Sequence, residues 1–349
     1  MLDLVLLTEK IEEIRIKNNI AGMSVAVTDV NGTIYKKGFG FENALRPEVP
    51  TYPDAMYKIA SMTKTVTAAV ILRLCQEGLL NLDIPVKQYL PWLKLSRPEA
   101  EKSMTLRHLL THTSGLPKDT GYIPDGTREE AGIDEVIKAT LPTLPMASVP
   151  GDNVYCYSNW GFNLAACVAT TVTGKTLTDL YKGYILNPLQ MDKTTFDFQV
   201  ASTYPFSQPH RVGENGKFEV IHHQRINMAY AGGGGLYSCV EDMTKWGRFL
   251  LRGGVTDSGE RLLTEETFGD MCSKHILREP DIGTYYGYGM LIYPLAERYV
   301  YGHNGNIDPY NSSIFVDHKT GLSVAVLMNS AAPNVRIELM EMVFAMAEE

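Results

Sequence analysis

The chain has 349 residues, of which 44% are hydrophobic and 21% charged, so it is long enough for two lobes or for one domain with a large insertion. Its net charge of −8 at pH 7 argues against a nucleic-acid partner, because phosphate binding needs a basic face. No segment approaches the roughly 20 apolar residues of a membrane span, so we expect no membrane partner either.

The N-terminal segment is predicted to form an amphipathic helix. Its apolar residues recur close to the helical period and are Leu4, Leu7, Ile11, Ile14 and Ile16. The segment lacks the basic residues that begin a secretory signal, which favours a cytoplasmic protein, although a chain with its leader removed would look the same. The five cysteines match no zinc or C-x-x-C spacing and are expected to be reduced, in agreement with that location.

Two β-rich regions flank a mainly helical middle. Residues 21–30 and 33–42 are β-type runs joined by Asn31-Gly32, which is a strong hairpin signal. Four further β-type runs lie between residues 284 and 330, and a closing helix is predicted after Pro333. The helices predicted between these ends are 62–77, 105–110, 131–139, 160–172, 176–186 and 241–251.

These elements predict an α+β fold, in which one antiparallel sheet is flanked by N- and C-terminal helices and carries an inserted, mainly helical lobe. Residues 1–60 and 200–349 are expected to form the sheet lobe, and residues 61–199 the helical lobe. The crevice between the two lobes is the expected place for a binding site.

The first candidate for chemistry is Ser61, which is followed three residues later by Lys64 at the start of a predicted helix. Residues three apart share a helix face, and free backbone N–H groups at a helix start could hold an oxyanion. Lys64 could act as a base only in its neutral form, which burial between two lobes would favour. By itself the pair has a simpler explanation, namely a helix cap followed by a solvated lysine.

Two further stretches are weak evidence for a functional site when each is taken alone. Tyr157 and Asn159 lie just before a predicted helix, where a phenol could relay a proton and an amide could bind a substrate carbonyl. For this stretch alone, a loop tyrosine and a helix-capping asparagine are the better explanation. His303 and Gly305 end a predicted strand, where the imidazole could contact a ligand and the glycine could let that ligand approach the backbone. Taken alone, a strand end that turns through Asn304-Gly305 is the simpler explanation.

The three stretches in this order, Ser-x-x-Lys, Tyr-x-Asn and His-x-Gly, resemble the three motifs of the serine β-lactamase and penicillin-binding-protein superfamily. The tyrosine of the second motif is similar to the class C-like branch, which includes esterases, D-aminopeptidases and transacylases. Four longer stretches resemble the same family, and they are residues 106–117, 187–191, 231–250 and 301–317.

The resemblance implies that Ser61 is the nucleophile and that Lys64 and Tyr157 move its proton. It also implies that the N–H groups of Ser61 and Asn306 form an oxyanion hole. Asn159 is then expected to orient the substrate and Lys64, while His303, beside Gly305, would contact the substrate or the tyrosine. No metal or organic cofactor is needed for this chemistry.

One departure from the β-lactamases narrows the function. They have Lys-Thr-Gly where this chain has His303-Asn304-Gly305, and the missing lysine is a cation suited to a penicillin carboxylate. We therefore predict a serine acyl hydrolase for a small ester or amide, of the esterase or D-amino-acid amidase type. A transacylase that uses an amine or alcohol acceptor is the alternative, while a true β-lactamase or a non-catalytic binding relative is less favoured.

Two histidines and a glycine run have structural interpretations. His108 and His112 are interpreted as structural, and Gly232 to Gly235 is expected to let the backbone pass close beneath the site. Specificity is expected to depend on loops 117–130, 200–225 and 276–288, since loops carry most binding differences within a fold. Tyrosines that could line the pocket there are Tyr122, Tyr285, Tyr286 and Tyr310.

Overall fold

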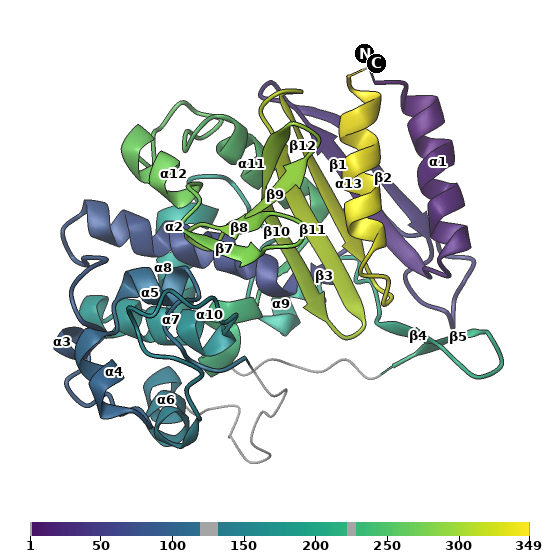
Figure 1. Ribbon diagram of the computed structural model, residues 1–349. Helices are drawn as coiled ribbons and strands as arrows, with labels where there is room; N and C mark the ends of the chain where they lie inside the picture. The colour runs from purple at the N-terminus through teal and green to yellow at the C-terminus, as the bar shows by residue number, and fades with distance from the viewer. Residues whose placement is uncertain (1, 119–131, 222–227, 349) are drawn as a thin grey trace.

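The two ends of the chain meet in one eight-stranded antiparallel sheet (Figure 1). The computed structural model describes residues 2–118, 132–221 and 228–348. The strand order is β2-β1-β12-β11-β10-β9-β8-β7, and the pairing of β1 with β12 places Val25 opposite Val326. The strands are β1 (Gly22–Thr28), β2 (Thr33–Gly40), β7 (Ile276–Glu279), β8 (Thr284–Tyr286), β9 (Leu291–Leu295), β10 (Arg298–Ile307), β11 (Tyr310–Asp317) and β12 (Leu322–Met328).

The predicted fold class is therefore confirmed, as is the hairpin through Asn31-Gly32. Both faces of the central strands are buried, so these strands read as nearly continuous apolar runs. Two small sheets lie outside the main one, and they pair β3 (Tyr57–Lys58) with β6 (Tyr237–Ser238), and β4 (His210–Val212) with β5 (Phe218–Val220).

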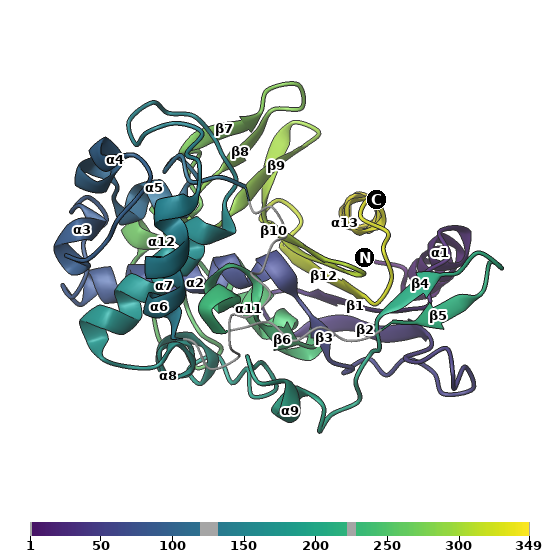
Figure 2. The ribbon, with the colours of Figure 1, turned by 90° about the horizontal axis from the view of Figure 1, so that it is seen from below.

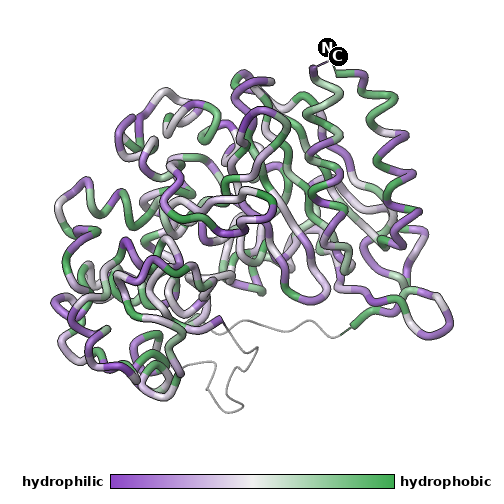
Figure 3. The backbone as a smooth tube through the Cα atoms, in the orientation of Figure 1, coloured by the Kyte–Doolittle hydropathy of each residue, from purple (hydrophilic) through white to green (hydrophobic). Residues whose placement is uncertain are grey.

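The terminal helices cover one face of the sheet. Helices α1 (Leu4–Lys17) and α13 (Val335–Met346) lie side by side there, with the two chain ends close together (Figures 1 and 2). Asp3 caps α1 by accepting hydrogen bonds from the next turn, and Leu7 and Ile11 are fully buried on its inner side. Hydrophobic and hydrophilic stretches alternate along α1 in Figure 3, as the predicted amphipathic helix requires.

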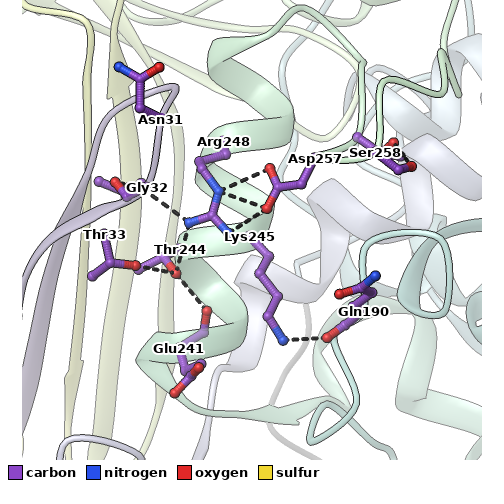
Figure 4. A network of polar contacts seen from close by, with 12 residues as sticks. Asn31, Gly32, Thr33, Gln190, Glu241, Thr244, Lys245, Arg248, Asp257 and Ser258 are labelled. Atoms are coloured by element: carbon purple, nitrogen blue, oxygen red, sulfur yellow. Dashed lines mark hydrogen bonds and ion pairs between the residues drawn. The ribbon is translucent and has the colours of Figure 1, made fainter.

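Helix α11 (Val240–Leu251) packs on the opposite face, and polar contacts fix its orientation (Figure 4). Arg248 donates from Nε and Nη2 to the carboxylate of Asp257, with a shortest distance of 2.6 Å, and from Nη1 to Thr28 Oγ1 on β1. Thr33 on β2 donates to Thr244 of the helix. These contacts connect α11 to the sheet on one side and to the following loop on the other.

The six helices predicted in the middle of the chain are all present. They are α2 (Thr63–Gln76), α5 (Leu106–Leu110), α6 (Ile133–Thr140), α7 (Asn159–Thr173), α8 (Leu177–Tyr181) continued by the π-helix η3 (Lys182–Leu186), and α11. The sequence did not predict the short segments α3 (Val86–Tyr89), α4 (Pro98–Ser103), α9 (Phe198–Ala201), α10 (Ala231–Gly234), α12 (Glu265–Met271), η1 (Ala60–Met62), η2 (Leu141–Thr143) and η4 (Met228–Tyr230).

Helix α2 runs through the core and is buried on nearly every side. An apolar helix with buried threonines can lie there because its Thr hydroxyls bond to nearby carbonyls, as Thr67 does to Thr63 O at 3.0 Å. The start of α2 therefore has a fixed position between helices and sheet. The predicted lobe boundaries at residues 60 and 200 stay a prediction. Across the residues described, the chain contains no helix both long and apolar enough to cross a membrane.

Candidate active site

Ser61 lies in the short helix η1, directly before α2. The preceding residue, Ala60, has φ of 46°, a left-handed conformation that is uncommon outside glycine and is found at many functional sites. The sheet holds this turn from behind, because Ser312 Oγ on β11 donates to Ile59 O at 2.8 Å. Gly305 on β10 also packs there, and a Cβ atom at this position would lie 2.2 Å from Ile59 O. Ser61 is thus fixed where the helices meet the sheet.

Lys64 lies one turn further along, and its side chain is fully buried. Its ammonium group donates to Ser61 Oγ at 3.1 Å, to Gly233 O at 2.5 Å and to Asn159 Oδ1. Three acceptors match the three donors of an ammonium group. The predicted close passage of the glycine run is confirmed, since a Cβ atom at Gly233 would lie 3.0 Å from that of Asn159.

Tyr157 approaches Ser61 from the loop before α7. Its hydroxyl donates to Ser61 Oγ at 2.7 Å, and its ring centroid lies 4.8 Å from Lys64 Nζ. The next residue, Ser158, caps α7 by accepting from Gly161 N at 3.3 Å, which fixes the end of the loop. The Ser61 hydroxyl therefore has Lys64 and Tyr157 within hydrogen-bond reach. Whichever of these two groups is deprotonated could receive the serine proton.

His303 is buried on β10, where it bonds to the Tyr286 hydroxyl and its ring faces that of Tyr157. Its Nδ1 faces Asn304 O at 2.5 Å and must donate there, so Nε2 accepts from the Tyr286 hydroxyl at 2.8 Å. Burial, together with the charge of Lys64, lowers the pKa of His303 to about 3. The ring is thus neutral at pH 7, and its centroid lies 6.5 Å from that of Tyr157.

A cavity of about 690 Å³ opens over Ser61. Of the predicted site residues, it brings together Ser61, Tyr157, Asn159, His303 and Asn306, with Lys64 buried behind them and Gly305 packed beside Ile59. The other lining residues are Lys118, Tyr155, Arg278, Glu279, Tyr286, Leu291, Asn304 and Arg336.

The four tyrosines that were expected to line the pocket differ in where they lie. Tyr286 lines the cavity, whereas Tyr310 is buried elsewhere and donates to Ser207 O at 2.8 Å. Tyr285 packs edge-on against Tyr299, with centroids 6.0 Å apart. Tyr122 and most of the predicted loop 117–130 fall outside the described residues, as do residues 222–225 of the second loop.

His112, which the sequence analysis interprets as structural, lies directly behind Tyr157. Its carbonyl accepts from Cys156 N at 2.8 Å and its Nδ1 from Ser158 N at 3.1 Å, so it holds both neighbours of the tyrosine. The two rings lie 4.3 Å apart. Burial keeps the pKa of His112 well below its usual value, which preserves Nδ1 as an acceptor.

Arg278 and Arg336 are site residues that the sequence did not single out, although Arg278 lies within the expected specificity loop 276–288. Arg278 on β7 pairs with Glu279 at 2.8 Å, while Arg336 reaches the site from α13 and donates to Gly305 O at 2.7 Å. No motif marks either arginine, and only the packing of the sheet and α13 brings them to the cavity.

Comparison with known proteins adds three findings. The family profile described as Beta-lactamase matches residues 7–343. Protein flp of Staphylococcus aureus strain MW2 is 26% identical over 90% of this chain and 60% of its own length. D-alanyl-D-alanine-carboxypeptidase/endopeptidase AmpH of Escherichia coli is 30% identical over 64% of this chain and 56% of its own. The chain thus spans little more than half the length of these relatives.

The solved structure of the octameric penicillin-binding protein homologue from Pyrococcus abyssi is also similar. It has a TM-score of 0.84 and 27% identity, and the match covers 98% of this chain and 77% of the homologue. The likeness therefore extends over both the sheet and the helices that surround the cavity.

Proposed function

Because the chain belongs to the β-lactamase family, as its motifs predicted, we propose that it is a serine acyl hydrolase acting on small esters or amides. The observation that carries the proposal is the contact of Ser61 Oγ with both Lys64 Nζ at 3.1 Å and Tyr157 OH at 2.7 Å. A nucleophile within hydrogen-bond reach of a base, which a third group orients, is the arrangement that acyl transfer needs.

In the proposed reaction, the Lys64–Tyr157 pair starts with one proton removed, so that Ser61 Oγ attacks the substrate carbonyl while its own proton passes to that pair. The N–H groups of Ser61 and Asn306 would stabilise the resulting oxyanion. The proton then moves to the leaving alcohol or amine as its bond to the carbonyl carbon breaks. A water molecule, deprotonated by the same pair, releases the acid and restores Ser61.

Asn159 would hold Lys64 in place, since its Oδ1 accepts from Nζ, and would present its amide nitrogen to the substrate. His303 would act through Tyr286, to which it is bonded at 2.8 Å, and would shape the pocket as a neutral group. The absence of a lysine in the third motif supports esters or D-amino-acid amides over penicillins, and the similarity to AmpH supports amides.

The test is turnover of short-chain p-nitrophenyl esters, D-alanyl amides and a chromogenic cephalosporin by wild type and Ser61→Ala. We expect Ser61→Ala to abolish turnover and to abolish the mass adduct formed by a fluorophosphonate. Undiminished turnover in this variant would refute the nucleophile assignment.

Tyr157→Phe should slow both acylation and deacylation by roughly 100- to 10,000-fold if Tyr157 relays the proton. Product analysis with added amines or alcohols would reveal a transacylase instead.

A further inference from the structure

Arg336 connects the C-terminal helix to the strand that borders the active site. It lies in the first turn of α13, and its Nη1 donates to Gly305 O on β10 at 2.7 Å and to Asn311 Oδ1 on β11 at 3.0 Å. Asn311 is itself buried, and its amide nitrogen donates to Pro309 O at 3.0 Å, which fixes the oxygen toward the arginine. The guanidinium is therefore held against one particular carbonyl.

That carbonyl belongs to the peptide bond between Gly305 and Asn306. In a trans peptide the C=O and the N–H point in opposite directions. A guanidinium that binds Gly305 O thus directs the Asn306 N–H away from itself, and Asn306 lines the same cavity as Ser61. A charged donor on the oxygen also polarises the peptide, which strengthens its N–H as a donor.

We propose that Arg336 is a positioning residue for the oxyanion hole: it orients and polarises the Gly305–Asn306 peptide so that the Asn306 N–H meets the developing oxyanion. This inference rests on the proposed function, because it assumes an acyl-transfer reaction at Ser61. Gly305 completes the arrangement, since only a residue without a side chain can approach Ile59 O so closely.

The charge on Arg336 persists at working pH. Burial, with the nearby Arg278, lowers the pKa of Arg336 to about 10, so the group stays protonated at pH 7. Burying a guanidinium even in part is costly unless its charge is used or paired, and Nη1 of the half-buried Arg336 has a carbonyl oxygen and an amide oxygen as partners. Its positive charge is therefore available to act on the peptide.

Arg336 also borders the cavity, so a different role must be separated from this one. It could bind an anionic substrate group directly, in which case only substrates that carry such a group would depend on it. An effect through the oxyanion hole would instead reach every substrate, neutral ones included, and every inhibitor that forms a tetrahedral adduct.

The experiment compares Arg336→Met and Arg336→Lys with wild type on neutral p-nitrophenyl butyrate and on p-nitrophenyl hemisuccinate, which carries a carboxylate. Inhibition by a neutral alkyl boronic acid, which forms a tetrahedral adduct on serine, is measured in parallel. Arg298→Met is the matched control, because Arg298 also joins β10 to β11, through Asp317 at 2.8 Å, at the end of β10 away from Gly305.

We expect Arg336→Met to lower kcat on the neutral ester by about tenfold to 100-fold with little change in KM, below the ~100- to 1,000-fold cost of losing a whole oxyanion donor. Boronate affinity should fall by a similar factor. Arg336→Lys should recover part of both, because it restores a charged donor, and it serves as the test if the methionine variant does not fold. Arg298→Met should lower Tm but leave kcat unchanged.

Unchanged turnover of the neutral ester in both variants would overturn the proposal, and so would a loss confined to the hemisuccinate. Wild-type turnover that Ser61→Ala abolishes establishes the reaction on which the inference depends. If wild type shows no such turnover, the proposed function fails and this inference fails with it. If Ser61-dependent turnover is intact and Arg336→Met does not affect it, this inference alone fails.

Discussion

The two walls of the cavity are built in different ways. On the helical wall, Ser61, Lys64, Tyr157 and Asn159 bond directly to one another. On the sheet wall, the polar side chains bond to groups other than the nucleophile, as Arg336 does to Gly305 O and Asn311 Oδ1, His303 to Tyr286 and Arg278 to Glu279. The helical wall has a compact set of groups suited to proton transfer, whereas the sheet wall presents a strand edge and positive charge.

This difference indicates a division of work between the walls. Groups that exchange a proton must lie within hydrogen-bond reach of one another, so they come from two segments in direct contact, η1 with the start of α2 and the loop that leads into α7. Groups that hold an oxyanion or a substrate need only face the same space, so they can come from β7, β10 and α13. Damage to each wall should consequently have a different kinetic signature.

The largest effect is expected from breaking the helical wall at Lys64. Lys64→Met keeps the length of the side chain but removes the proton acceptor, and it should lower kcat by about 100- to 10,000-fold. Burst and steady-state kinetics on a p-nitrophenyl ester would measure the loss. Lys58→Met is the matched control, since Lys58 is another buried lysine, on β3, and should retain activity. Near-wild-type turnover in Lys64→Met would contradict the assignment of proton transfer to the helical wall.

A smaller effect is expected where the walls touch. Gly305→Ala would place a Cβ atom 2.2 Å from Ile59 O, so β10 must move away from the turn that carries Ser61. A displacement of this kind should cost roughly 100-fold in kcat/KM. Gly269→Ala on α12 is the control, because nothing lies within 4 Å of the added atom and the helix should become slightly more stable. Equal activity in the two variants would show that the contact is unimportant.

The smallest effect concerns acid stability, to which a histidine in each wall contributes. His112 and His303 have pKa values lowered by burial, so the unfolded chain binds protons more readily than the folded one. Stability from these groups is complete above about pH 6.5 and falls as the pH decreases below it, for His303 down to its folded-state pKa of about 3. Each should lose about 1 kcal/mol between pH 6.5 and 5.5, given ~1.4 kcal/mol per pKa unit.

Thermal unfolding of wild type, His112→Asn and His303→Asn across this pH range measures both contributions. Each variant should show a shallower fall in Tm with acid, and His112→Asn should keep an acceptor for Ser158 N and tolerate the φ of 60° at that position. Unchanged slopes in both variants would argue that neither ring is neutral in the folded protein.

The sequence by itself determined the family, the helices that follow Ser61 and Tyr157, and most strands of the main sheet. Runs of β-type residues bounded by turn residues predicted most strands of both ends, whereas β7 lies in the expected loop 276–288. The Ser61–Lys64 spacing was sufficient to place the two residues within reach of each other, because residues three apart in a helix are neighbours. The three motifs in order then indicated which segments should meet, and Ser61 and Tyr157, 96 residues apart, do meet.

Only the tertiary structure decided the contacts that no local period encodes. Three of these contacts depend on how separate elements pack. They are the bond of His303 Nε2 to Tyr286, the position of His112 behind Tyr157, and the bond of Arg336 to Gly305 O. Arg336 lies 31 residues after Gly305 in a helix whose pattern reports only its buried face, so nothing in that pattern reveals which carbonyl its side chain meets. Helical and strand periods describe neighbours along the chain, whereas the geometry of this site is set by neighbours across it.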